Sequence, residues 1–480
     1  MDRARDWLVV GVVSISIASV FAVAASAGLG FAVAGGALVL SWIALSMRSM
    51  MMGLGVLLVA RSSMDVTTNY QLPLPSALAY LNAAGVVAVL FSILACFYLW
   101  PRLRGIRFPA PVRIYIGFLF LTLLIIPLAR MPITSAQEWT RQFAPFCAFL
   151  ILMHYFRSLP EALVKKYLSS GVVIIILASV VPLAVAMYQI VTNTGEHLNA
   201  GFNRVDGTFP MPNGLAAFIA LIVPMLACAM ELWTDWKRRT LLGGWIVFAL
   251  VVLVATYTRT AWISLAVSAL VLFFMSRQVR VGTLIFVALL GFVGYVAAGS
   301  VITARFSDLS GGAFYRSSLA GRLNIWNAAA PLLFRNPVSG QGLGMFAIDM
   351  GLFEAGNVAG QASAPVIAAH NDYLRVLVET GAIGFTLYFG TFVLFIRRGW
   401  KMWKGSDALE TKIISRAFVA VCLGQLVAYA AENMFGQPSL QFYFWSLAGV
   451  ATGIMLRDKN DSFGPSEISG QAALHTLAGT

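Results

Sequence analysis

The residue of this sequence best suited to acid–base chemistry is His370, which opens the stretch 370–375 (HNDYLR). It stands where a long connection meets an apolar segment, so we expect it at the N-terminal end of a membrane helix. An imidazole titrates near neutral pH and can act there as a general base or acid. Nearby arginines and the helix N-terminus would both disfavour its charged form. The alternative is a helix-start residue that pairs with Asp372 or with a backbone group.

Two other groups of residues near His370 have structural interpretations. Arg375 and Glu379 are four residues apart at the start of the same apolar segment, which predicts an ion pair that stabilises the helix. The glycines of 340–344 (GQGLG) lack the strand–turn–helix surroundings of a phosphate-binding loop. They predict a tight turn that returns the chain to the membrane.

The composition of the chain indicates a membrane protein. Hydrophobic residues make up 59% of the 480 residues and charged residues 11%, whereas an ordinary soluble domain has about 25% charged residues. The mean hydropathy over the whole chain is +0.81. These values exclude a soluble enzyme, a nucleic-acid-binding protein and a disordered scaffold. The four cysteines all lie in apolar runs, so no disulfide framework is indicated.

A helix that crosses a bilayer needs about 20 mostly apolar residues. Fourteen segments of the sequence approach this length, and two of them, 49–60 and 143–156, are so short that twelve spans are the alternative. We therefore predict an all-α polytopic membrane bundle of 12–14 spans with a long external loop subdomain. The candidate spans are 7–26, 29–46, 49–60, 77–99, 114–130, 143–156, 167–191, 214–232, 241–258, 260–275, 281–300, 373–396, 412–431 and 440–456.

Lysine and arginine accumulate in alternate connections between these segments, which predicts that those connections and both termini are cytoplasmic. The tail from about residue 457 is expected to be disordered. The net charge of +13 then lies wholly on the cytoplasmic side, so it gives no argument for a nucleic-acid partner. Ten basic residues remain outside, and all are arginines, which bind phosphate through two bonds more readily than lysine does. They are Arg61, Arg130, Arg141, Arg204, Arg259, Arg305, Arg316, Arg322, Arg335 and Arg375.

Two external connections are long, at about 192–213 and 301–372. A connection of about 70 residues usually carries function or a small subdomain. Within it, 320–336 has helical spacing and suits a helix at the membrane interface. We divide the chain into N-terminal membrane helices (1–200), helices with a first arginine loop (201–300), the long loop (301–372), C-terminal membrane helices (373–456) and the tail (457–480).

Four stretches on the predicted external side match one known pattern. In His-[Asn/Ser/Gln]-x9-Gly-x2-[Gly/Thr/Tyr], the four defined positions are His370, Asn371, Gly381 and Gly384. The other three stretches are 201–213 (GFNRVDGTFPMPN), 258–262 (TRTAW), and the run from Gly321-Arg322 through Trp326 and Pro337 to 340–344. In their order along the chain, these four stretches resemble the O-antigen ligase and O-antigen polymerase superfamily, over about residues 200–455.

The resemblance implies a membrane glycosyltransferase of the C-type architecture, in the bacterial inner membrane. Its donor would be a glycan linked to undecaprenyl pyrophosphate, presented at the periplasmic face, and His370 would be the general base on the acceptor hydroxyl. Arginine forks would bind the pyrophosphate and stabilise its growing charge. The candidates are Arg204, Arg259 and Arg322, with Arg305 or Arg316 in addition. The external segments contain neither an Asp-x-Asp motif nor a His/Cys cluster, so we predict that no metal and no cofactor is needed.

Among these candidate pyrophosphate ligands, the resemblance favours Arg322 most and Arg204 next. Arg259 has an alternative as a helix-end arginine that extends to the membrane surface. Three functions stay open. A polymerase would join lipid-linked repeat units of an O-antigen or exopolysaccharide. A ligase would move the finished glycan to lipid A-core or, in a related branch, to a protein hydroxyl. The third is a flippase or other transporter of lipid-linked glycans, which is less expected because transporters carry polar groups at the bilayer midplane.

Overall fold

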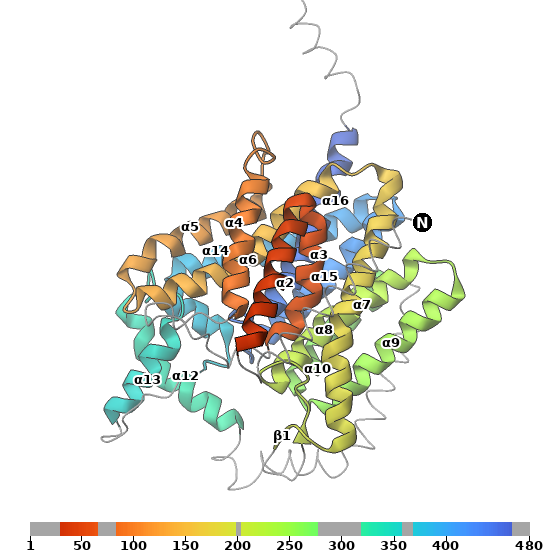
Figure 1. Ribbon diagram of the computed structural model, residues 1–480. Coiled ribbons are helices and arrows are strands. Elements are labelled where there is room, and N and C mark those ends of the chain that lie inside the picture. Colours follow the sequence, from red (N-terminus) through yellow and green to blue (C-terminus); the bar gives the residue numbers. More distant parts are fainter. Residues whose placement is uncertain (1–28, 66–82, 198–202, 277–317, 358–367, 463–480) are drawn as a thin grey trace, which may run out of the picture.

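The structure, a computed structural model, describes residues 29–65, 83–197, 203–276, 318–357 and 368–462 as an almost wholly helical bundle (Figure 1). Two 3₁₀ turns, Ile126–Leu128 and Met230–Leu232, follow α5 and α8. The α-helices are α2 (Leu29–Arg48), α3 (Met50–Met64), α4 (Ala83–Leu99), α5 (Ala110–Ile125), α6 (Pro132–Arg157), α7 (Glu161–Thr192), α8 (Pro212–Ala229), α9 (Trp236–Ala255), α10 (Arg259–Met275), α12 (Ser318–Arg335), α13 (Met345–Asn357), α14 (Asp372–Gly405), α15 (Leu409–Tyr429) and α16 (Pro438–Ser462). The strands β1 (Glu196–His197) and β2 (Asn203–Arg204) pair antiparallel.

Every predicted span that falls on described residues coincides with one of these helices. Within the described ranges, seven helices are long and apolar enough to cross a bilayer: α5, α7, α8, α9, α14, α15 and α16. Shorter apolar helices are found at α2, α3, α4 and α10. The prediction of an all-α polytopic bundle is therefore confirmed. The predicted spans 7–26 and 281–300 lie outside the described residues, as does most of the predicted tail.

Helix α6 begins well before the span predicted at 143–156, at Pro132. Its first turns carry Glu138, Arg141 and Gln142, which interrupt the apolar run but have partners in the fold. Glu138 forms an ion pair with Arg141, and Gln142 donates to a backbone carbonyl in the α15–α16 connection at 2.8 Å. Polar groups can be buried where each has a partner, so hydropathy alone misses this part of the helix.

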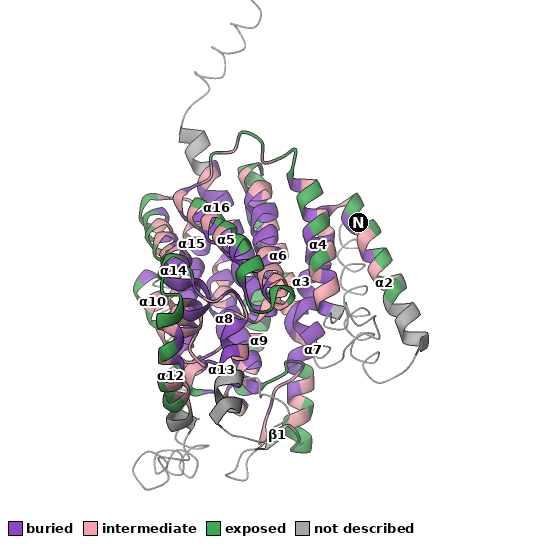
Figure 2. Ribbon diagram, turned by 90° about the vertical axis from the view of Figure 1, so that its left-hand side faces the viewer, coloured by how far each residue is buried: buried purple, intermediate pink, exposed green. Residues whose placement is uncertain are grey.

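The core is centred on α6 and α16, the most extensively packed pair of described helices. Glycines on α16 let the two backbones approach each other, as small residues do between membrane helices. A Cβ atom added at Gly453 would lie 2.7 Å from the carbonyl oxygen of Met153. The buried Trp445 packs its ring on Tyr115 of α5, with ring centroids 4.0 Å apart. Figure 2 shows the buried residues concentrated in these central helices.

The chain after α12 is joined to α14 at a break in that helix. Gly381 of α14 has φ 63° and ψ −174°, which is not helical. Backbone hydrogen bonds connect 337–342 to 378–383 there, including one from the N–H of Gly342 to the carbonyl of Glu379 at 2.8 Å. The predicted glycine turn is therefore confirmed, although it leads into α13 and not directly into a membrane helix. Because it provides partners for the backbone groups that the break exposes, it fixes the first turns of α14.

Candidate active site

The polar residues singled out from the sequence meet at one end of the bundle, where α6, α8, α10, α14 and α16 begin and α15 ends. Helices α12 and α13 and strand β1 lie at this end too (Figure 2). Direct contacts join residues from four separate segments of the chain. His370 contacts Asn433. Glu432, the neighbour of Asn433 in the chain, contacts both Arg322 and Asn213, and Asn213 contacts Arg204.

His370 lies immediately before α14, with a half-buried side chain and a left-handed backbone at φ 48°. Its backbone N–H donates to Oδ1 of Asn433 at 2.9 Å. Its ring atom Nδ1 lies 3.3 Å from Nδ2 of the same asparagine. Non-glycine residues seldom adopt a positive φ, and they do so where the surrounding structure requires it. Asn433 therefore holds both the backbone and the ring of His370.

Two further contacts support the position of His370. Asn371 is the N-cap of α14, and its side chain accepts from the N–H of Leu374 at 3.1 Å. Trp326 of α12 donates its indole N–H to the carbonyl of Ala369 at 2.9 Å. Asn371 thus caps the start of α14, and Trp326 connects α12 to the residue before His370.

The surroundings of His370 keep its ring neutral. Burial lowers the pKa of the imidazole below its ordinary value, and the positive charge of Arg322 lowers the pKa further. Both effects disfavour the charged form of a histidine. A neutral ring is the form that can accept a proton, so the electrostatics suit a general base.

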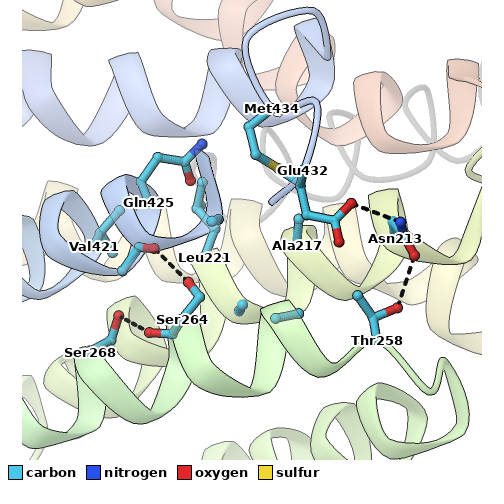
Figure 3. A pocket seen from close by; sticks show the side chains of 14 residues that line it. Asn213, Ala217, Leu221, Thr258, Ser264, Ser268, Val421, Gln425, Glu432 and Met434 are labelled. Carbon is cyan, nitrogen blue, oxygen red and sulfur yellow. Dashed lines mark hydrogen bonds between the residues drawn. The ribbon is translucent and has the colours of Figure 1, made fainter. Parts of the chain in front are cut away.

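Glu432, in the connection between α15 and α16, is the central acceptor of the cluster. Its side chain is 4% exposed. Oε1 accepts from the hydroxyl of Thr260 at 2.7 Å, and Oε2 accepts from Nδ2 of Asn213 at 2.7 Å (Figure 3). Nη2 of Arg322 lies 3.6 Å from Oε1. Burial raises the pKa of Glu432, while the hydrogen bond from Thr260 and the charge of Arg322 oppose that rise.

Arg204, on β2, forms hydrogen bonds to the protein through all three of its guanidinium nitrogens. Nε donates to the carbonyl of Thr256 at 2.9 Å, and Nη2 donates to Oδ1 of Asn213 at 2.6 Å and to the hydroxyl of Thr258 at 3.0 Å. Nη1 lies 3.5 Å from a carboxylate oxygen of Glu196. Arg204 therefore connects the first arginine loop to α8 and to the α9–α10 junction.

The remaining predicted cations lie in different surroundings. Arg259 is the exposed first residue of α10, next to the Thr260 that contacts Glu432. Arg305 and Arg316 lie outside the described residues. The predicted ion pair of Arg375 is confirmed: its Nε lies 3.1 Å from Oε1 of Glu379. A second carboxylate, that of Glu138 on α6, lies 3.2 Å from Nη2 of the same arginine, so this arginine has a structural role.

A small cavity lies beside Glu432, between α8, α10 and α15 (Figure 3). Asn213, Thr258 and Glu432 line one end, and Ser264 and Ser268 line the other. Its volume is about 10 Å³, which is near the minimum for one water molecule. The cavity is therefore too small for a ligand larger than a water molecule.

Among the described residues, no three His, Cys, Asp or Glu side chains come close enough together to hold a metal ion. The cations described at this end are arginines instead. Metal independence stays a prediction, to be tested by chelation.

The sequence analysis missed Glu432, Asn433 and the amide of Asn213. Glu432 and Asn433 interrupt the boundary between the last two apolar segments, and an acidic residue at a membrane boundary is a signal for function. Asn213 was noted as the last residue of the first arginine loop, but the sequence does not indicate that it joins Arg204 to Glu432.

Comparison with known proteins gives one family. Residues 244–389 match the family model described as O-antigen ligase, and no curated protein matches the chain. The matched segment runs from within α9 to within α14 and contains Arg259, Arg322, His370 and the motif glycines Gly381 and Gly384. This match supports a membrane-bound role of the O-antigen ligase or polymerase type in surface polysaccharide assembly. Residues 244–389 are thus similar to the O-antigen ligase domain, in agreement with the superfamily that the sequence motifs resemble.

Proposed function

We propose that this protein transfers a glycan from undecaprenyl pyrophosphate to an acceptor hydroxyl, as a polymerase or a ligase of O-antigen or exopolysaccharide. The observation that carries the proposal is the convergence of His370, Arg322 and Arg204 on the Glu432–Asn433 corner, from segments that are far apart in the sequence. A neutral imidazole beside guanidinium groups is what the displacement of a pyrophosphate by an alcohol requires.

In the proposed reaction the acceptor oxygen attacks the anomeric carbon of the donor glycan. The bond from that carbon to the pyrophosphate oxygen breaks, and undecaprenyl pyrophosphate leaves with the electron pair. His370 takes the proton of the hydroxyl on Nε2, from the tautomer that carries its own hydrogen on Nδ1. The lowered pKa of His370 supports this step because the ring is unprotonated at neutral pH. Pyrophosphate is a good leaving group, so the protein has to bind it and stabilise its charge, and need not activate it covalently.

Arg322 is the arginine we propose to contact the leaving pyrophosphate most directly. Its side chain is 21% exposed, and its 3.6 Å separation from Glu432 is longer than a hydrogen bond. Its guanidinium group can therefore donate hydrogen bonds to a ligand. Arg204 has less freedom because the protein accepts hydrogen bonds from all its nitrogens, so we propose that it shapes the site and contributes charge. Arg259, Arg305 and Arg316 remain proposed phosphate ligands.

The charge asymmetry of the sequence supports a periplasmic site. The positive-inside rule places both termini in the cytoplasm of a bacterial inner membrane and the His370 end outside. A donor with its pyrophosphate at that end would place its polyprenyl tail among the apolar helices. Lipid A-core or a second lipid-linked glycan would reach the same end from the periplasm.

The experiment that tests the proposal supplies synthetic undecaprenyl-pyrophosphate repeat unit to the purified protein in lipid nanodiscs, with and without lipid A-core. A ladder of longer lipid-linked products identifies a polymerase, and transfer that depends on core identifies a ligase. The matched variant is His370→Asn, because asparagine adopts a positive φ more readily than most residues and retains the local backbone. It should fold normally and form no product. Product at the wild-type rate from this variant would contradict the role of His370.

A lipid-linked glycan transporter is the alternative. It would form no new glycosidic bond in this assay and would move the labelled donor across the bilayer of a proteoliposome. The structure offers it little support, since the described ionisable cluster lies at the helix ends and not at the midplane.

A further inference from the structure

A large cavity lies at the end of the bundle opposite His370. Its volume is about 350 Å³. It is lined by the first half and middle of α3, the end of α6, the first half of α7, the end of α8, the start of α15 and the first half of α16. The candidate active site lies at the other ends of α6, α8 and α15, so the two sites are separated along these helices. The cavity takes no part in the function proposed above.

The interior of this cavity is apolar and has room for a ligand. Representative lining residues are Met52, Phe156, Ile174, Met225 and Ile413. An engineered apolar cavity of about 150 Å³ takes up benzene and stays free of water, and this cavity has more than twice that volume. Gly171 of α7 lines it, and a Cβ atom added there would meet no atom within 4 Å. The space therefore suits a hydrocarbon chain.

The rim of the cavity is polar and basic. Lys166 lines it and is exposed, and the hydroxyls of Ser49, Tyr167 and Ser170 line it as well. Lys165 stands next to Lys166 in the sequence and is also exposed. A lysine at the end of a membrane helix lies at the depth of the lipid phosphates and attracts anionic headgroups. The cavity thus combines an apolar interior with a cationic mouth.

The cavity can be reached from the bilayer between α7 and the rest of the bundle. Of the described helices, α7 packs mainly on α3 and only lightly on α8 and α9. Most of its length is not buried in the bundle: only 33% of its most apolar window is buried. A lipid chain can therefore enter between α7 and the rest of the bundle without separating the core pair α6 and α16.

We propose that this cavity binds one acyl chain of an anionic phospholipid, with Lys166 binding the phosphate. The charge at the mouth favours an anionic lipid over a zwitterionic one. The tail of a polyprenyl donor is the competing occupant, but the cation at this mouth is at the opposite end from the arginines that would hold its pyrophosphate.

The test measures lipid binding and not activity, so its result is independent of the proposed glycosyl transfer. Detergent-purified full-length protein is delipidated, incubated with phosphatidylglycerol, phosphatidylethanolamine or undecaprenyl phosphate, and examined by native mass spectrometry. We expect one tightly held phosphatidylglycerol per chain and weaker retention of phosphatidylethanolamine. Gly171→Leu fills the cavity and should weaken phosphatidylglycerol binding by about tenfold or more. Lys166→Gln should remove the preference for phosphatidylglycerol over phosphatidylethanolamine.

The matched control is Gly390→Leu on α14, where an added Cβ also meets no atom within 4 Å but which does not line the cavity. It should bind phosphatidylglycerol as the wild type does. Equal retention of both phospholipids by the wild type, or unchanged binding by Gly171→Leu, would overturn the proposal. Displacement of phosphatidylglycerol by equimolar undecaprenyl phosphate would overturn it in favour of a polyprenyl site.

Discussion

The side-chain amide of Asn433 is oriented by the backbone N–H of His370, and that orientation determines the tautomer of the imidazole. The N–H can only donate, so the atom 2.9 Å away is the amide oxygen Oδ1. Nδ2 then faces Nδ1 at 3.3 Å and donates to it. A neutral ring that accepts at Nδ1 carries its hydrogen on Nε2. Nε2 can accept a proton from a substrate only in the other tautomer, which carries the hydrogen on Nδ1. The amide Nδ2 of Asn433 also donates toward Nδ1, so it disfavours that tautomer.

Asn433→Asp should therefore change the pH dependence of transfer. The carboxylate keeps an acceptor for the backbone N–H and presents a second acceptor to Nδ1–H, which leaves Nε2 free to accept. It also stabilises the imidazolium, so the pKa of His370 should rise. The base acts only when unprotonated. The acidic limb of the pH–rate profile should accordingly move to higher pH, with activity retained above it.

The charge-matched control is Asn371→Asp. It adds the same charge one residue from His370, and aspartate is as good an N-cap as asparagine, but Asn371 contacts Leu374 and not the ring. Its acidic limb should move less than that of Asn433→Asp. If the two profiles coincide, or if neither moves, Asn433 does not control the protonation of His370.

Arg322 should affect both the rate and the pH profile, and two substitutions separate these effects. Arg322→Gln removes the charge that lowers the pKa of His370, so the pKa should rise and the acidic limb should move to higher pH. Arg322→Lys keeps the charge and leaves the limb near its wild-type position, but it loses the fork. Both variants should lose about 10²–10³ in kcat, the usual cost of removing one donor to a developing anion. The pH dependence of transfer at saturating donor measures both quantities. Full activity in Arg322→Lys would rule out bidentate binding.

The sequence predicts the membrane helices well because each is a run of apolar residues. It also singles out His370 and Arg322 by a recognisable pattern, and the structure brings both to the Glu432–Asn433 corner. The sequence does not predict the start of α6, since the buried polar residues there depend on partners in other helices. Nor does it predict that Asn433 holds His370, because the two residues are 63 positions apart. Their contact depends on how the α15–α16 connection meets the start of α14, which hydropathy does not specify.

Arg375→Met should destabilise the fold rather than act on the reaction alone. Arg375 lies between the carboxylates of Glu138 and Glu379, at 3.2 Å and 3.1 Å. Without it two nearly buried acids face each other, and breaking a buried pair in this way costs about 3–5 kcal/mol. We expect a clear fall in the apparent Tm of the detergent-solubilised protein, partly restored by adding Glu138→Gln and Glu379→Gln. Arg335→Met, at an exposed position on α12, is the control and should leave the Tm unchanged. An unchanged Tm for Arg375→Met would mean that this ion-pair group is not structural.

Gly381→Ala should be far more damaging than a glycine-to-alanine change elsewhere on the same helix. Gly381 has φ 63° and ψ −174°, a conformation accessible almost only to glycine. A Cβ atom there would also overlap the carbonyl group of Val338, in the segment that is hydrogen-bonded to the break. Backbone strain of this kind alone costs about 1–3 kcal/mol. A backbone shift that relieved the strain would separate the turn from α14 and displace His370. Gly390→Ala, where an added Cβ meets no atom within 4 Å, should instead stabilise the helix slightly, as alanine does relative to glycine. Apparent Tm values for the two variants, with transfer assays on whichever folds, test this difference. Equal Tm values would show that the break at Gly381 is not needed to hold the turn.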